Sequence, residues 1–314
     1  MELIGEYINY IRAVKRFSPR TVDIYRSALD EFTAYLNGAE LLPSLNNSLL
    51  RSYEVHLLSK RKLSPRTVRL HLSVLSGFCR YLMKQGLIQS NPLHSLAKPK
   101  MEKRLPVFYR KEALEAYFSS SRLWADEECL ALVSAGRPEA YEHILRRLII
   151  SLLYHTGIRR SELIGLQCSN VDISRSVLKV KGKGDKMREI PLSAELIREI
   201  LLYLQACSKM GFAQAPSGSL LLTKAGRSLY PAYVDKAVKQ ELSARSGISQ
   251  RKSPHVLRHS IATELLNEGA NLNSIKEMLG HSSLAATQVY THNSIEKLKE
   301  AYTQAHPKCQ ASKK

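Results

Sequence analysis

The chain has 314 residues, and 47 lysines and arginines against 28 acidic residues give it a formal net charge of +19. Hydrophobic residues make up 44% of the sequence and charged residues 24%, a composition typical of globular proteins and not of disordered or fibrous ones. The length favours two domains over one, and the excess positive charge favours a polyanionic partner, with nucleic acid ahead of an anionic membrane surface.

Local features exclude several other classes of protein. The N-terminal stretch MELIGEYINY carries acidic residues where a secretory signal needs a basic region and a long apolar run. The longest apolar stretch, around residues 148–154, is too short to span a bilayer. The five cysteines are scattered and never in C-x-x-C spacing, which argues against a disulfide framework and a zinc ribbon. We therefore expect a reducing cytoplasm as the compartment.

Residues 1–97 are expected to form a helical bundle. The string SPRTV occurs twice, beginning at Ser18 and at Ser64. Each serine suits a helix N-cap, each following proline suits the first helical position, and apolar residues then recur at helical spacing. Two interpretations stay open: a duplicated unit, or one favourable helix start used twice.

A linker and a second domain follow. Prolines and basic residues over 97–110 predict an exposed linker, which we place at 98–108. Helices are expected over 111–118 and 141–154, with a loop-like stretch between them. Alternating residues within 171–192 predict a β-hairpin that turns at two glycines, and the chain from Ala194 onward is mostly helical in pattern.

Two short strings place cations at structural boundaries. In HTGIRRSELIGL (155–166), Gly157 permits a sharp turn, and Ser161 or Glu162 can hold the guanidinium of Arg159 or Arg160. In KGKGDK (181–186), a lysine on a glycine-flanked turn can reach a phosphate, although the string fits neither a P-loop nor a dinucleotide fingerprint. Taken alone, the first string is more typical of a surface ion pair and the second of a solvated hairpin tip.

Two further strings add histidines and a tyrosine. PHVLRHSIAT (254–263) puts His255, Arg258 and His259 on one helix face, and it lacks the glutamate that a zinc protease motif requires after its first histidine. In LGHSSLAATQVYTH (279–292), Gly280 can end one helix, Ser282 or Ser283 can cap the next, and Tyr290 lies about two turns further on. These residue types, with no carboxylate cluster for Mg²⁺, suit phosphoryl transfer without a metal, because fixed cations can meet the charge that develops on phosphorus.

The complete ordered set of strings resembles the tyrosine recombinase (phage integrase) family, and its Xer-type members in particular. The resemblance implies a mainly α fold with a small β-sheet or hairpin. Residues 1–97 would form a SAM-like DNA-binding domain for the core site, 98–108 a linker, and 109–314 an α+β catalytic domain that closes with the first as a clamp around DNA.

The same resemblance implies an enzyme that cleaves and rejoins DNA strands at specific sites without metal or ATP. Tyr290 would attack a phosphodiester to form a 3′-phosphotyrosyl link, and Lys183 would protonate the leaving 5′ oxygen. Glu162 would orient the first arginine, for which Arg159 is preferred over Arg160. The family pattern places the catalytic residues at Arg159, Lys183, His255, Arg258, His281 and Tyr290.

The implied partner is double-stranded DNA, bound by a homo-tetramer on two inverted-repeat sites or by a hetero-tetramer with a second recombinase. Residues 294–308 resemble the family's C-terminal helix, which docks on a neighbouring protomer, and their apolar spacing also fits a helix folded back on its own chain. A non-catalytic DNA-binding protein of the same fold and a type IB topoisomerase are the competing functions. Candidates for contact with DNA are Arg20, Arg66, Arg69, Lys181 and Lys186.

Overall fold

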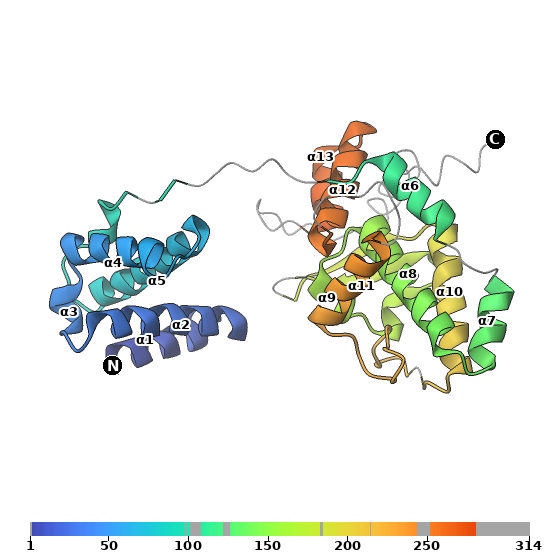
Figure 1. Ribbon diagram of the computed structural model, residues 1–314, viewed down its shortest axis with the longest axis horizontal. Coiled ribbons are helices and arrows are strands. Elements are labelled where there is room, and N and C mark those ends of the chain that lie inside the picture. The colour runs from blue at the N-terminus through green and yellow to red at the C-terminus, as the bar shows by residue number, and fades with distance from the viewer. Residues whose placement is uncertain are drawn as a thin grey trace. The chain divides into compact units, whose positions relative to one another are not determined.

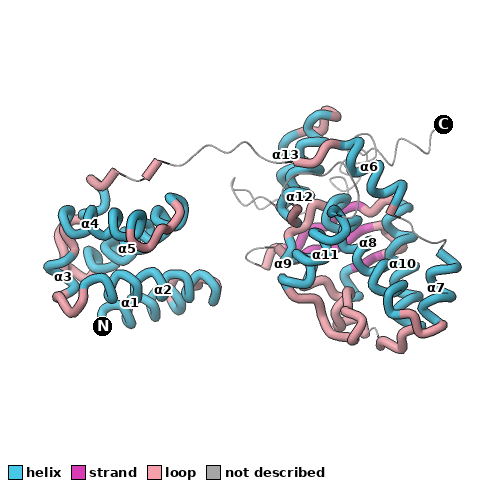
Figure 2. Tube along the Cα trace, in the orientation of Figure 1, coloured by secondary structure: helices cyan, strands magenta, loops and turns pink. Residues whose placement is uncertain are grey.

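The chain divides into two compact units, Met1–Arg104 and Leu105–Lys314, in a computed structural model (Figure 1). The structure describes residues 2–97, 99–100, 108–121, 126–182, 185–213, 215–243 and 252–280. These ranges are mainly helical and contain one small antiparallel sheet, so the predicted fold class is confirmed (Figure 2).

The N-terminal unit is a helical bundle built around aromatic and aliphatic side chains. It comprises α1 (Glu2–Ala13), α2 (Pro19–Leu36), α3 (Leu41–Ser44), α4 (Asn47–Ser59), α5 (Pro65–Lys84) and the 3₁₀ helix η1 (Pro92–His94). The rings of Phe32 and Tyr53 meet edge to face with centroids 5.0 Å apart, and both side chains are fully buried. The helices pack their apolar faces on this cluster, as the spacing in the sequence predicts.

The two SPRTV strings form the same turn in detail. Ser18 caps α2 by accepting the N–H of Thr21, and Ser64 caps α5 by accepting the N–H of Thr67. The predicted N-caps are thus confirmed.

The residues just before the caps also correspond. Arg16 and Lys62 both adopt the left-handed conformation, with φ of 51° and 50°. The next residue closes the preceding helix in each case, since Phe17 N–H donates to the carbonyl of Ile11 and Leu63 N–H donates to that of Leu57. The pairs α1–α2 and α4–α5 are therefore equivalent helical hairpins, which favours the interpretation of a duplicated unit.

Helix α8 (Pro138–Thr156) is the centre of the second unit. It is apolar around most of its circumference and buried along nearly its whole length, as a helix enclosed by others must be. Around it pack α7 (Asp126–Ser134), α10 (Ala194–Lys209), α11 (Pro231–Ser243) and α12 (Pro254–Asn267) (Figure 1). Helix α6 (Lys111–Ser120) precedes this group and contributes to the same core.

Two expectations for this unit are wrong in part. The stretch expected as a loop between residues 118 and 141 contains α7, because Cys129 and Val133 bury on α8 and α10 while acidic residues occupy the first turn, where the helix dipole favours them. The stretch 97–110 is also not exposed throughout, because it is buried just beyond the linker placed at 98–108. Tyr109 is buried, and its N–H donates to Ser260 Oγ over 2.8 Å.

The sheet confirms the predicted strands. Strands β1 (Val171–Asp172), β2 (Val177–Lys181) and β3 (Met187–Pro191) pair antiparallel in the order β1-β2-β3, with Lys181 opposite Met187. The 3₁₀ helix η2 (Cys168–Asn170) leads into β1. Gly182 lies in the turn as predicted, and its N–H donates to the carbonyl of Lys186.

Two more short helices complete the described part of this unit. Helix α9 (Arg160–Ile164) follows α8, and α13 (Leu272–Leu279) follows α12 and contacts β3. The expected helical character from Ala194 onward is confirmed for the ranges that the structure describes. Within those ranges, no helix combines the length and the apolar character that crossing a bilayer requires.

Candidate active site at the end of helix α13

The turn after α8 directs Arg159 towards the site. Helix α8 ends at Gly157, which takes the left-handed conformation with a φ of 60°. A β-carbon on Gly157 would lie 2.5 Å from Leu279 Cδ2, so a larger residue would have to displace that side chain as well as adopt a strained positive φ. Arg159 is then the extended N-cap residue of α9, and its own N–H donates to Glu162 Oε2 over 2.8 Å.

The carboxylate of Glu162 is the centre of a charge network. Its Oε1 accepts from Arg159 Nη1 at 2.7 Å and from Arg188 Nη1 at 3.1 Å, and its Oε2 accepts from Arg188 Nη2 at 2.7 Å. Burial alone would raise the pKa of Glu162, but the hydrogen bonds from Arg188 and Arg159 and their charges outweigh it and lower that pKa to about 2. The carboxylate is therefore ionised at any physiological pH and holds Arg159 in place.

Three arginines converge on the last carbonyls of α13. Met278 O accepts from Arg188 Nε at 2.8 Å, Leu279 O from Arg258 Nη2 at 2.6 Å, and Gly280 O from Arg159 Nη2 at 2.8 Å. The final carbonyls of a helix have no partner within the helix and carry the negative end of its dipole, so guanidinium groups suit this position. Gly280 ends α13 in the left-handed conformation, which confirms the predicted helix end.

Arg258 is the most deeply buried of the sequence-predicted cations that the structure describes. Its Nη1 also donates to Gly157 O at 2.6 Å, which ties α12 to the turn that carries Arg159. Burial, followed by repulsion from Arg159, lowers the pKa of Arg258 to about 10. A guanidinium that is desolvated and crowded by a like charge gains from an additional anion, so the pair of arginines forms an anion-binding arrangement.

The histidines of α12 do not share the burial of Arg258. His255 and His259 are exposed whereas Arg258 is buried, although the spacing of the three residues on α12 is the helical one that the sequence predicts. The pKa of His255 is lowered, first by desolvation and then by the charges of Arg160, His259 and Arg258. The charge of Asp235 raises this pKa in part. His255 is therefore neutral at pH 7 and able to accept a proton.

Arg160, the competing candidate for the first arginine, faces elsewhere. It forms an ion pair with Asp235 on α11 and has no recorded bond to Glu162 or to the end of α13 within the described ranges. Of the two neighbouring arginines, only Arg159 joins the network that holds Arg258.

The candidates for DNA contact lie on the surfaces of both units. Arg20 and Arg66 occupy equivalent exposed positions in the first turns of α2 and α5, and Arg69 is half-buried one turn further along α5. Within the described residues, none of these three side chains forms an ion pair. At the hairpin, Lys181 pairs with Asp185 over 3.0 Å, and Lys186 is exposed beside it.

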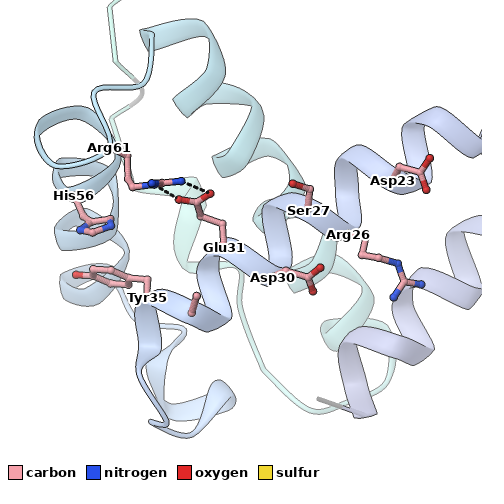
Figure 3. A pocket seen from close by; sticks show the side chains of 9 residues that line it. Asp23, Arg26, Ser27, Asp30, Glu31, Tyr35, His56 and Arg61 are labelled. Carbon is pink, nitrogen blue, oxygen red and sulfur yellow. Dashed lines mark hydrogen bonds and ion pairs between the residues drawn. The ribbon is translucent and has the colours of Figure 1, made fainter.

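An open hollow on the N-terminal unit has a different character. It lies between α2 and α4 and is lined by acidic and basic side chains, among which Arg61 donates to Glu31 Oε1 over 2.5 Å (Figure 3). Asp23 and Asp30 add two more carboxylates on α2. Because carboxylates repel phosphate, this hollow does not suit the backbone of a nucleic acid.

Arg188 belongs to the charge network of Glu162, although the sequence did not predict it. It lies on β3, and the only sequence signal for it was a charged residue at a position whose neighbours on the same face, Leu178, Val180 and Ile190, are apolar. Lys183, His281 and Tyr290 lie outside the described residues, as does the expected helix over 294–308. The described part of the site thus provides the guanidiniums of Arg159 and Arg258 at the last turn of α13, and the neutral imidazole of His255.

The chain matches known protein families and relatives over most of its length. The sequence pattern of the phage integrase family matches residues 125–297, and that of the phage integrase N-terminal SAM-like domain matches residues 4–86. The chain is 35% identical to tyrosine recombinase XerC of Chlorobaculum parvum, over 96% of this chain and 93% of the relative. It is 30% identical to tyrosine recombinase XerD of Staphylococcus epidermidis, over 98% and 99% of the two chains.

Solved structures share the fold. XerH site-specific recombinase bound to palindromic difH substrate, in a post-cleavage complex, matches with a TM-score of 0.68 and 24% identity over 90% of this chain and 79% of that chain. The Tn1549 transposon integrase in complex with transposon right end DNA matches with the same TM-score at 19% identity, over 95% and 98% of the two chains.

Proposed function

Since this chain belongs to the phage integrase family, it is a tyrosine recombinase, an enzyme that cuts and rejoins DNA strands at specific sites, and on that premise we propose the roles of its residues. Tyr290 is the nucleophile. The single observation that best supports the proposal is the convergence of Arg159 and Arg258 on the last turn of α13, immediately before the chain continues to His281 and Tyr290.

The proposed reaction is a reversible transesterification. The phenolic oxygen of Tyr290 forms a bond to phosphorus, the bond from phosphorus to the 5′ oxygen breaks, and a 3′-phosphotyrosyl link remains. Arg159 and Arg258 hold the nonbridging oxygens, where negative charge accumulates in the transition state. Attack by a 5′ hydroxyl of another strand reverses the step, so strand exchange needs neither ATP nor a metal ion.

Proton transfer is assigned to the remaining side chains. His255, whose pKa is lowered, accepts the proton of Tyr290 at neutral pH. Lys183 donates a proton to the leaving 5′ oxygen, and His281 donates a hydrogen bond to the phosphate. Glu162 does not react: it is ionised and fixed by two guanidiniums, and it orients Arg159.

The wider assembly follows from the same premise. Residues 1–97 bind the core site of double-stranded DNA, 98–108 link the domains, and 109–314 carry the chemistry, with Arg20, Arg66, Arg69, Lys181 and Lys186 as contacts to DNA. Four protomers act on two inverted-repeat sites, and residues 294–308 dock on a neighbouring protomer. The scattered cysteines, of which the four in the described ranges are free thiols, favour the cytoplasm as the compartment.

Covalent capture on DNA tests the nucleophile. The protein, its Tyr290→Phe variant and a control variant at an exposed tyrosine, Tyr230→Phe, are each mixed with nicked genomic fragments without metal, and the protein-linked DNA is sequenced after denaturation. We expect adducts at one inverted-repeat motif with the unaltered chain and with Tyr230→Phe, and none with Tyr290→Phe. Adducts that persist in Tyr290→Phe would refute the nucleophile, and adducts at unrelated sequences would favour a topoisomerase.

A further inference from the structure

Arg188 is a buried charge on the apolar face of the sheet. It lies opposite Val180 in the register of β2 and β3, and its side chain is only 6% exposed. Removing a guanidinium from water is costly unless strong partners replace the solvent. A buried arginine is therefore tolerated in a core position only where hydrogen-bond acceptors and a counter-ion surround its guanidinium.

The partners of Arg188 come from two other elements. Its Nη1 and Nη2 make a two-pronged contact with the carboxylate of Glu162 on α9, and its Nε donates to the carbonyl of Met278 on α13. The planar guanidinium therefore joins β3, α9 and α13 through one rigid group. Lysine, with a single ammonium centre, cannot reproduce this set of directions.

Two glycines lie close to the guanidinium, and Gly280 leaves room for it. A β-carbon on Gly182 would lie 3.4 Å from Arg188 Nη1, and one on Gly280 would lie 3.0 Å from the same atom and 3.2 Å from Cζ. The hairpin and the end of α13 therefore approach the guanidinium closely. Such close packing restricts the orientation of the side chain more than hydrogen bonds alone do.

We propose that Arg188 is a positioning residue of the recombination site, which fixes the Glu162 carboxylate relative to the last turn of α13. Through Glu162 it sets the place of Arg159, and through Met278 it sets the point from which the chain continues to His281 and Tyr290. This inference rests on the proposed function, because its effect is exerted on residues that the proposal places at the phosphate.

The shared carboxylate explains why the effect reaches Arg159. Glu162 Oε1 accepts from both Arg159 and Arg188, and the N–H of Arg159 donates to Oε2. Without Arg188, the carboxylate would keep only the two contacts made by Arg159, and the pair would lose its connection to β3 and to Met278. A displacement of about 1 Å at a group that contacts the transition state can slow a reaction about 100-fold.

The first test compares Arg188→Met with a matched control, Arg175→Met. Arg175 makes a similar two-pronged contact with Glu189 on the same β3 strand, but its side chain is 40% exposed, against 6% for that of Arg188. Each variant is assayed for DNA binding and for single-turnover formation of the covalent adduct on a nicked substrate. We expect Arg188→Met to bind DNA within about threefold of the unaltered chain and to form adduct about 100-fold more slowly, with Arg175→Met near normal in both.

A pH profile separates positioning from simple loss of structure. In the unaltered chain, Glu162 titrates far below the assay range, so it contributes no pH dependence above pH 4. Removal of Arg188 leaves a buried carboxylate with fewer donors, so its pKa rises, and adduct formation then increases with pH through the new value. The titration of His255 gives an acidic limb in every variant. We expect a second acidic limb in Arg188→Met alone and its disappearance in the double variant with Glu162→Gln, whose amide does not titrate.

A second variant, Arg188→Lys, keeps the inference testable if Arg188→Met does not fold. It retains the positive charge and one donor nitrogen, so we expect it to fold even where Arg188→Met does not. We expect its adduct rate to lie between those of the unaltered chain and Arg188→Met. Equal adduct rates for Arg188→Lys, Arg175→Met and the unaltered chain would overturn the inference alone. Absence of adduct with the unaltered chain would overturn the proposed function, and this inference with it.

Discussion

At the scale of single residues, the site depends on one carboxylate that serves two guanidiniums. Glu162 holds Arg159 from within the same short helix and Arg188 from a neighbouring strand. A buried carboxylate between two cations is ionised because the cations compensate for its lost hydration, and the cations are in turn tolerated because of the carboxylate. Loss of either kind of partner therefore destabilises the whole cluster.

We predict that Glu162→Gln lowers the free energy of unfolding by about 3 kcal/mol at pH 7, because it leaves the buried guanidinium of Arg188 without its counter-ion. The pKa of Glu162 is lowered in the folded state from 4.5 to about 2, so its stabilising effect is complete above about pH 4.5 and is lost as the pH falls through about 2. The difference between the two proteins should therefore narrow over that interval, as urea unfolding at pH 7, 4 and 3 would measure.

Glu189→Gln is the control for that prediction. Glu189 pairs with Arg175, which is 40% exposed, and exposed ion pairs contribute little to stability. We expect a change of less than about 1 kcal/mol at pH 7. A loss as large as that of Glu162→Gln would contradict the importance of burial at the site.

A second prediction concerns Gly280. Both Gly280 and Gly269 have positive φ, 65° and 84°, but a β-carbon on Gly280 would meet Arg188 whereas one on Gly269 would meet nothing within 4 Å. Gly269→Ala should therefore cost only the backbone strain, about 1 kcal/mol, and Gly280→Ala about 1 to 2 kcal/mol more. Chemical denaturation of the two variants measures the difference, and equal costs would refute the close contact with Arg188.

The roles of some of these residues can be predicted from the sequence, and the roles of others cannot. Pairing of Glu162 with Arg159 can be predicted because the residue that caps a helix start and the third residue of that helix are neighbours, whatever the rest of the fold does. The role of Arg188 cannot, since its partners are at Glu162 and Met278, and only the packing of β3 against α13 brings them together.

At the scale of elements, local chemistry determines where helices begin. The caps at Ser18 and Ser64 are predictable because the serine, the proline and the amide that the serine accepts lie within four residues. Helix α7 is not predictable in the same way: it is short, and it is stabilised by burial of Cys129 and Val133 on α8 and α10. Tertiary packing, which the linear pattern does not contain, decides such cases.

The equivalence of the two hairpins yields a third prediction. Ser18→Ala and Ser64→Ala should each destabilise the fold by about 1 kcal/mol, and by similar amounts, because each removes the same cap from the same turn. Amide exchange at Thr21 and Thr67 should accelerate in the respective variant and not in the other.

Ser73→Ala provides the matched control. Ser73 lies within α5, and its hydroxyl donates to the carbonyl of Arg69, a bond that a helix does not require. We expect no loss of stability from Ser73→Ala. Unequal effects at Ser18 and Ser64 would argue against the equivalence of the hairpins.

At the scale of the whole molecule, the effect of the net charge of +19 on DNA binding depends on where the charged side chains lie. The hollow of the N-terminal unit places Arg26 and Arg61 among carboxylates, so these cations are partly neutralised within the protein. Arg20 and Arg66 repeat the same exposed position on the two hairpins and form no ion pair within the described ranges. We therefore expect the distribution of charge, more than its total, to decide which cations contact DNA phosphates, with Arg20 and Arg66 favoured over Arg26 and Arg61.

The salt dependence of DNA binding tests that distribution. Each phosphate contact releases about one counter-ion, so affinity should fall by about 10³ to 10⁵ between 50 and 200 mM salt if about 6 to 10 phosphates are contacted. Removal of both Arg20 and Arg66, as Arg20→Gln with Arg66→Gln, should reduce the slope of log affinity against log salt by about 2. Arg26→Gln removes one charge from the carboxylate-lined hollow and should leave the slope unchanged. A slope that falls equally for each arginine removed would mean that total charge, and not the repeated hairpin position, governs binding.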